Sequence, residues 1–181
     1  MAGTCGTMSL AALFNRKSRT AVQALYGAIV AAARNPTFYA EWGVPDTLDG
    51  RFELIALHAF LAIRRLKQSG DNTAFAQALF DTMFADLDRN LREMGVGDLS
   101  VGRQVKTMAK AFYGRVIAYE RGLAGSDSLD DALRRNLYGT IVPEAAQIAA
   151  AAAYVRRQAR ALDAAPVSLL LAGGFPLAQE G

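Results

Sequence analysis

The chain has 181 residues, of which 52% are hydrophobic and 20% are charged, and its formal net charge is +3. This length favours one domain with a sizeable core, and the apolar fraction excludes a disordered chain. A single cysteine, Cys5, excludes an internal disulfide, and no apolar run reaches the roughly 18 residues that a membrane-spanning helix needs. Alanine and leucine dominate over β-branched residues. The composition therefore predicts an all-α fold.

The N-terminal part is predicted to contain a lead-in and two helices. Residues 1–17 read as a flexible lead-in without the features of a signal peptide, and residues 18–165 as the helical domain. Ser18 is the predicted N-cap of a helix over 19–34, which ends at Asn35-Pro36. A short helix beginning at Pro36 follows. Its aromatic side chains are expected to close one end of the core: Phe38, Tyr39 and Trp42.

Two consecutive helices dominate the centre of the chain. Asp49 is the predicted cap of one that runs to Gly70, and Asp71 the cap of the next, which ends at Gly95. Their apolar residues recur at steps of three and four over faces wider than one neighbouring helix could cover. We expect an antiparallel hairpin with further helices against it. Three pairs on the second helix have ion-pair spacing: Asp86–Arg89, Asp88–Arg92 and Arg89–Glu93.

The remaining helices are predicted from caps and breakers. Ser100 is expected to cap a helix to Arg121, in which Gly114 would mark a close helix crossing. Ser128 is the predicted cap of a short helix with its leucines inward, and Pro143 the start of a last long helix. Residues 166–181 form a C-terminal tail without a clear period, whose run Leu169 to Leu171 is expected to dock on the body or on another molecule. Together, these predicted elements indicate an all-α, single-domain bundle of about six to seven helices.

The sequence contains no assembled catalytic constellation. His58 is the only histidine and is predicted at the margin of an apolar helix face, which favours a structural role over that of a ligand or general base. A second histidine and a cysteine pair are absent, and no Glu-x-x-His repeat, phosphate loop or GxSxG motif occurs. We therefore expect no enzyme activity, no metal and no cofactor. The basic clusters are interrupted by acidic or apolar residues, so DNA is not an expected partner.

Three segments carry a resemblance to a known family: LHAFLAIRRLK (57–67), LFDTMFADLDRNLREMGVGDLSVGRQVKTMAKAFYGRVIAYE (79–120) and LRRNLY (133–138). In order and spacing they resemble the ubiquinol–cytochrome c chaperone family of respiratory complex III assembly factors. The resemblance implies a helical chaperone that binds newly made cytochrome b, or another complex III subunit, without catalysing a reaction. The ribosome and a membrane surface are further contacts that it suggests. Phe60 replaces a tryptophan expected in mitochondrial members, and we expect no long targeting extension. A bacterial cytoplasmic protein, peripheral to the inner membrane, is the expectation.

Carried over by position, the resemblance implies partner-binding roles for ten residues: His58, Arg64, Arg65, Asp81, Asp86, Arg89, Arg92, Tyr119, Arg134 and Asn136. Charges beside wide apolar faces are typical of an interface with a polar rim. The alternative, that these pairs only hold helices together, stays open.

A second hypothesis is a helical pocket protein that binds a small apolar ligand such as quinone, haem or lipid. It is motivated by the aromatic residues Phe38, Tyr39, Trp42, Phe60, Phe80 and Phe84. A deep closed cavity would favour this hypothesis, and a shallow open groove would favour the chaperone. The oligomeric state stays open.

Overall fold

The computed structural model describes residues 10–139 and 141–178, and these residues form helices and turns without a strand. The elements are α1 (Leu10–Ala33), α2 (Thr37–Ala40), α3 (Leu48–Gln68), α4 (Thr73–Glu93), α5 (Asp98–Ala124), α6 (Leu129–Leu133), the π-helical η1 (Arg134–Tyr138), α7 (Ala145–Ala164) and α8 (Val167–Leu171). The predicted all-α, single-domain fold is confirmed. None of the described helices has the length and hydropathy to cross a bilayer.

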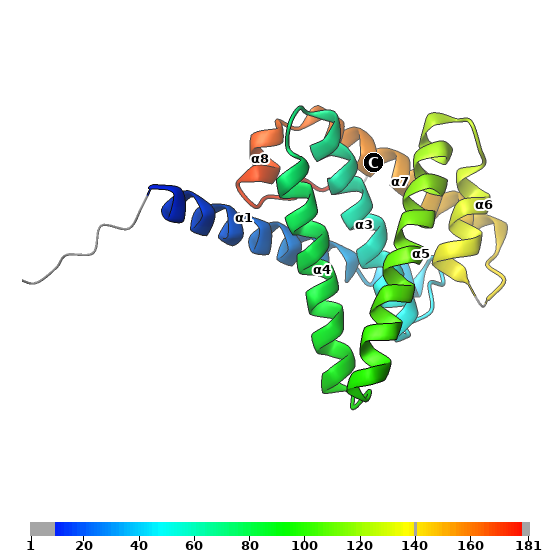
Figure 1. Cartoon of the computed structure of the whole chain (residues 1–181). Coiled ribbons are helices and arrows are strands. Elements are labelled where there is room, and N and C mark those ends of the chain that lie inside the picture. Colours follow the sequence, from blue (N-terminus) through cyan, green and yellow to red (C-terminus); the bar gives the residue numbers. More distant parts are fainter. Residues whose placement is uncertain (1–9, 140, 179–181) are drawn as a thin grey trace, which may run out of the picture.

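Helix α3 is the centre of the bundle. It packs against α1, α4, α7, α8 and η1 (Figure 1). Between Phe52 and Ile63 every residue except Ile55 is buried. A helix that is buried around most of its circumference needs neighbours on all sides. The wide apolar face predicted from the sequence is therefore covered by helices from both halves of the chain.

Helices α4 and α5 form a long hairpin that extends beyond the other helices (Figure 1). Gly95 turns the chain between them with a φ of +82°, a conformation that favours glycine. The two helices meet through aromatic rings, because Phe112 of α5 lies 5.6 Å from Phe80 and 6.1 Å from Phe84, measured between ring centroids. α4 also packs on α3, which confirms the expected hairpin of these two consecutive helices.

The first helix begins earlier than predicted. α1 starts at Leu10, so Ser18 lies within the helix and is not its cap. Of the predicted lead-in, residues 10–17 are helical and residues 1–9 lie outside the described part. Polar residues such as Ser18 are tolerated within an exposed helix. They indicate the start of a helix only where the apolar repeat does not continue on their N-terminal side.

Four other predicted starts are wrong by a few residues. The observed N-caps are Thr47 for α3, Asn72 for α4, Gly97 for α5 and Glu144 for α7, in place of starts at Asp49, Asp71, Ser100 and Pro143. Each predicted residue has a neighbour that can also begin a helix. Local sequence therefore locates a helix start only to within a few positions.

We predicted a close helix crossing at Gly114, but the crossing lies at Gly122. A Cβ on Gly114 would meet nothing within 4 Å, whereas one on Gly122 would lie 2.8 Å from the Cα of Leu129. Gly122 therefore allows α6 to pack closely against the end of α5. Ser128 caps α6 as predicted, since its side chain accepts a hydrogen bond from the backbone of Asp131.

The tail folds back onto the body. α8 packs on α1 and α3, and Leu170 is fully buried. Beyond α8, the side chain of Gln158 on α7 holds the backbone of the tail with two hydrogen bonds. Its Nε2 donates to the carbonyl of Pro176 at 2.6 Å, and its Oε1 accepts from the amide of Ala178 at 2.8 Å. Gln158 is itself completely buried.

Candidate functional site

Two grooves open beside the first turns of α3. The α3–α5 groove has a volume of about 890 Å³ and is lined by the loop before α3, the α4–α5 turn, α5 and η1. The α1–α4 groove has a volume of about 620 Å³ and lies among α1, α2, α3 and α4. Leu48, Phe52 and Met94 line both grooves. The two grooves therefore share one apolar ridge.

The loop before α3 shapes the edge of both grooves. Thr47 caps α3 by accepting a hydrogen bond from the amide of Gly50 at 3.1 Å. A Cβ on Gly50 would lie 2.0 Å from the carbonyl oxygen of Pro45, so only glycine allows the loop to fold this tightly. This turn places Leu48 on the rim, where 43% of the residue is exposed.

Large apolar side chains are exposed around the rim. Met94, which lines both grooves together with Leu48, is 55% exposed. Outside the groove linings, Leu99 at the start of α5 is 93% exposed, and Val142, which follows η1 by a few residues, is 95% exposed. Such a concentration of exposed aliphatic groups is typical of an interaction surface.

The floor of the α3–α5 groove is polar. The Nε of Arg115 on α5 donates to Oε2 of Glu53 on α3 at 2.6 Å, and its Nη2 donates to Oε1. Burial raises the pKa of Glu53, and the guanidinium of Arg115 acts in the opposite direction. The hydroxyl of Tyr119 is buried nearby without a hydrogen-bond partner among the described residues. The groove thus combines apolar walls with an ion pair that solvent barely reaches.

The α1–α4 groove contains a second polar contact. The hydroxyl of Tyr26 on α1 donates to Asp86 on α4 at 2.9 Å, and Arg89 donates to the same carboxylate at 2.6 Å. The predicted Asp86–Arg89 pair is therefore confirmed. Burial, together with the carboxylate of Asp86, raises the pKa of Tyr26. These contacts hold α1 against α4 beside the groove.

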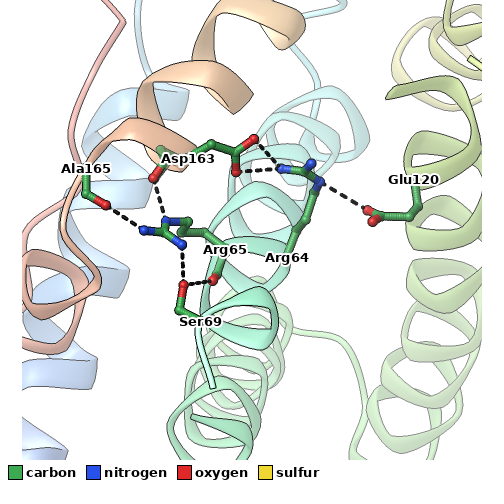
Figure 2. A network of polar contacts seen from close by, with 7 residues as sticks. Arg64, Arg65, Ser69, Glu120, Asp163 and Ala165 are labelled. Carbon is green, nitrogen blue, oxygen red and sulfur yellow. Dashed lines mark hydrogen bonds and ion pairs between the residues drawn. The ribbon is translucent and has the colours of Figure 1, made fainter. Parts of the chain in front are cut away.

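Arg64 and Arg65 lie away from the grooves and join helices (Figure 2). Arg65 donates to the backbone carbonyls of Leu162 and Ala165, each at 2.7 Å, and so ties α3 to the end of α7. Arg64 forms an ion pair with Asp163 at 2.9 Å and another with Glu120 of α5 at 3.4 Å. These contacts favour the alternative in which the two arginines hold the fold together.

Two of the predicted partner-binding residues are completely inside the protein. His58 is 0% exposed and Tyr119 is 1% exposed, so neither lies on a surface that a partner could touch in this structure. Nδ1 of His58 lies 2.7 Å from the carbonyl of Leu54, and Nε2 lies 2.7 Å from the hydroxyl of Tyr154. We expected His58 at the margin of an apolar face. It is buried because Tyr154, from distant α7, supplies its second hydrogen-bond partner.

The remaining predicted residues are spread over the molecule. Asp81, Arg89, Arg92 and Arg134 are exposed, and Asn136 is partly buried in η1. Arg92 pairs with Asp88 at 2.7 Å, as predicted, and also with Asp98. Of the ten residues, Asp86 lines the α1–α4 groove and Asn136 lines the α3–α5 groove. The structure therefore does not gather the ten into one site.

Sequence reasoning missed Glu53 and Arg115, which form the floor of the larger groove. Glu53 precedes Ala56, Leu57 and Phe60 at helical spacing, so it lies on the core-facing side of α3. A lone acidic residue on such a face needs a buried cationic partner. That rule could have identified Glu53, but it could not have identified Arg115 among the basic residues of the chain.

The aromatic residues that motivated the pocket hypothesis do not line one closed cavity. Phe38 and Trp42 border a third, open pocket of about 610 Å³ with Tyr154 of α7. Phe60 instead packs on Tyr119, and Phe80 and Phe84 pack on Phe112 in the α4–α5 hairpin. In the described chain no three His, Cys, Asp or Glu side chains form a cluster that could hold a metal ion.

The geometry defines a class of protein: a helical bundle with two open grooves that share an exposed apolar ridge. Residues 40–178 match the family model described as ubiquinol-cytochrome C chaperone. The chain belongs to this family.

Relatives and a solved structure agree with this assignment. The chain is 26% identical to ubiquinol-cytochrome-c reductase complex assembly factor 1 of Xenopus laevis, over 81% of this chain and 74% of that protein. It is 28% identical to the Drosophila melanogaster factor of the same name, over 84% of this chain and 62% of that protein. The crystal structure of the Cbp3 homolog from Brucella abortus superposes with a TM-score of 0.80 at 38% identity, covering 93% of this chain and 96% of that one.

Proposed function

We propose that this protein is an assembly chaperone for ubiquinol–cytochrome c reductase that binds newly made cytochrome b and catalyses no reaction. In this proposal an apolar segment of the client lies in the α3–α5 groove and extends over the shared ridge. Family membership supports the assembly role. The observation that carries the proposal is the shared ridge itself, where Leu48 and Met94 expose apolar surface that a partner could bury.

A newly made membrane subunit exposes apolar helices that water does not solvate. A groove with aliphatic walls and an exposed apolar ridge shields such a helix from water. Methionines suit this task, because their flexible side chains adapt to different contact shapes. Met94 and Met108 both line the α3–α5 groove.

The polar residues around the grooves complete the proposed surface. Asp86 lines the α1–α4 groove and pairs with Arg89, and Arg92 follows one turn later on the same helix. We propose that these charges contact polar parts of the client. The proposal locates the protein in a bacterial cytoplasm, close to the inner membrane and to ribosomes that make the client.

The test is complementation of a strain that lacks the gene. Leu48→Glu/Met94→Glu places two carboxylates on the shared ridge, at positions exposed enough to leave the fold intact. The matched control is Leu169→Glu/Leu177→Glu, which adds the same charges at similarly exposed leucines on α8 and the tail. We expect the ridge variant to lower assembled complex III and spectroscopic cytochrome b while the control restores both.

A photo-crosslinking side chain at position 94 should also capture cytochrome b during its synthesis, and one at position 177 should not. Normal complex III in the deletion strain would overturn the proposed function. Equal activity of the ridge variant and the control would move the client away from the grooves. Circular dichroism of each purified variant separates loss of binding from loss of fold.

A further inference from the structure

The outward face of α5 is a continuous exposed stripe. Six residues follow one another at alternating steps of four and three, which keeps them within about 80° of the helix circumference. All six are exposed: Leu99, Arg103, Lys106, Lys110, Tyr113 and Ile117. The buried residues Val101, Phe112 and Tyr119 lie on the opposite side of the helix. The stripe is straight and about 27 Å long at the helical rise of 1.5 Å per residue.

The stripe is cationic, and its cations are unpaired. Arg103, Lys106 and Lys110 form no ion pair within the described part of the chain, and no acidic residue occurs from 99 to 114. The acidic residues at the two ends of α5 already form ion pairs with arginines of other helices. Asp98 pairs with Arg92, and Glu120 pairs with Arg64.

The neighbouring helix α4 adds little opposing charge. Asp88 is neutralised by Arg92, and Asp81 accepts a hydrogen bond from Gln77 on its own helix. On α4, Asp81 and Glu93 form no ion pair within the described residues, so two carboxylates of that helix stand against three unpaired cations of the stripe. The face attracts anions.

The stripe also exposes large apolar side chains. Leu99 is 93% exposed, and Tyr113 and Ile117 are each more than half exposed. A purely solvated helix face has no use for these groups, and a nucleic-acid surface gains nothing from leucine or isoleucine. Cations alternating with aliphatic side chains and a tyrosine are instead typical of a helix that lies on a lipid surface, where the cations meet anionic headgroups and the apolar groups enter the acyl boundary.

We propose that the outward face of α5 docks this protein on an anionic phospholipid bilayer. The flat, straight stripe matches a planar surface. Arg103 belongs both to the stripe and to the lining of the α3–α5 groove, and Thr107 and Ala111 line that groove from the adjoining flank of α5. Docking therefore brings the groove to the membrane surface. This inference deepens the proposed function, because it places the client groove beside the membrane into which the client inserts.

The test is binding of the full chain to vesicles, measured by co-sedimentation without any client. Phosphatidylcholine vesicles are compared with vesicles that also contain phosphatidylglycerol. We expect binding only to the anionic vesicles. Lys106→Glu/Lys110→Glu should weaken this binding by at least about tenfold, because each cation near the surface contributes to the attraction. Leu99→Ser/Ile117→Ser should also weaken it while leaving the net charge unchanged.

The matched control is Lys67→Glu/Arg160→Glu, which makes the same charge change at two exposed, unpaired cations on α3 and α7. It should bind like the unaltered protein. Equal binding to both vesicle types, or an equal loss in the control, overturns the proposal. A Leu99/Ile117 variant with full affinity, together with equal binding to an RNA homopolymer, assigns the stripe to another polyanion. None of these outcomes changes the result of the complementation test, so the two proposals fail independently.

Discussion

Glu53 and Arg115 form an ion pair across the floor of the α3–α5 groove, with 9% and 17% of their side chains exposed. The pair joins the central helix to the α4–α5 hairpin. Removing one partner leaves a buried charge without compensation. We expect Arg115→Met to lower the free energy of unfolding by about 3–5 kcal/mol, measured by urea denaturation.

The double variant Glu53→Leu/Arg115→Met should recover most of that loss, because two apolar side chains need no partner. If the double variant also loses its client while it folds normally, the pair contributes to recognition. A single variant as stable as the unaltered protein would show that water reaches Glu53 once Arg115 is gone.

His58 should make stability depend on pH in the acidic range. Leu54 offers only a carbonyl acceptor, so Nδ1 of His58 carries the proton and Nε2 accepts from the Tyr154 hydroxyl. Burial lowers the pKa of His58 from 6.5 to about 4. Below pH 6.5 the unfolded chain binds a proton that the folded chain does not bind. Stability is therefore fully present above that pH and falls by about 3 kcal/mol as the pH drops towards 4.

Denaturation at a series of pH values measures this slope. His58→Gln retains a donor and an acceptor but does not titrate, so its stability should change less between pH 6.5 and 4. Parallel curves for the two proteins would mean that other groups cause the acid sensitivity.

Gly114 and Gly122 should respond in opposite ways to the same substitution. Gly114→Ala places a methyl group in open space and should stabilise the protein by up to about 1 kcal/mol, because alanine favours helix. Gly122→Ala forces α6 away from α5 at the backbone of Leu129 and should destabilise it by about 1–3 kcal/mol. Thermal unfolding of the two variants measures both effects. Similar changes in melting temperature for the two would refute the close crossing at Gly122.

Charge reversal on α4 should separate partner binding from folding. Arg89→Glu/Arg92→Glu alters exposed side chains whose ion pairs are open to solvent. We expect impaired complex III assembly with little change in melting temperature. Arg65→Ala is the contrasting variant, because it removes bonds to the carbonyls of Leu162 and Ala165 and should lower the melting temperature. A large drop in melting temperature for the α4 variant would assign those arginines to the fold.

The helices could be predicted because their apolar residues repeat with the helical period over many turns. Many of the residues that fit the period are buried in the structure, such as Leu57 and Ile63 in α3 and Leu79, Met83 and Leu87 in α4. The starts of the helices could not be predicted, since Thr47 and Asp49 are both good caps and only the fold of the preceding loop selects Thr47.

The candidate site was less accessible to sequence reasoning. Its polar floor joins residues 62 positions apart, and the partner of His58 lies 96 positions away. No local pattern encodes such pairs. The short helix α8 was missed for a related reason, because five residues are too few to display a period.

Because Gln158 hydrogen-bonds the backbone of residues 176 and 178, the packing of α7 depends on a segment that is synthesised after it. Helix α7 leaves the ribosome before the backbone groups that its buried amide requires. Until that later stretch has emerged, Gln158 has neither donor nor acceptor in the interior, and packing around α7 carries that penalty. The protein thus reaches its mature packing only once residues 176 to 178 have folded back onto α7, and a released chain truncated before Pro176 should be more protease-sensitive at α7 than the full chain.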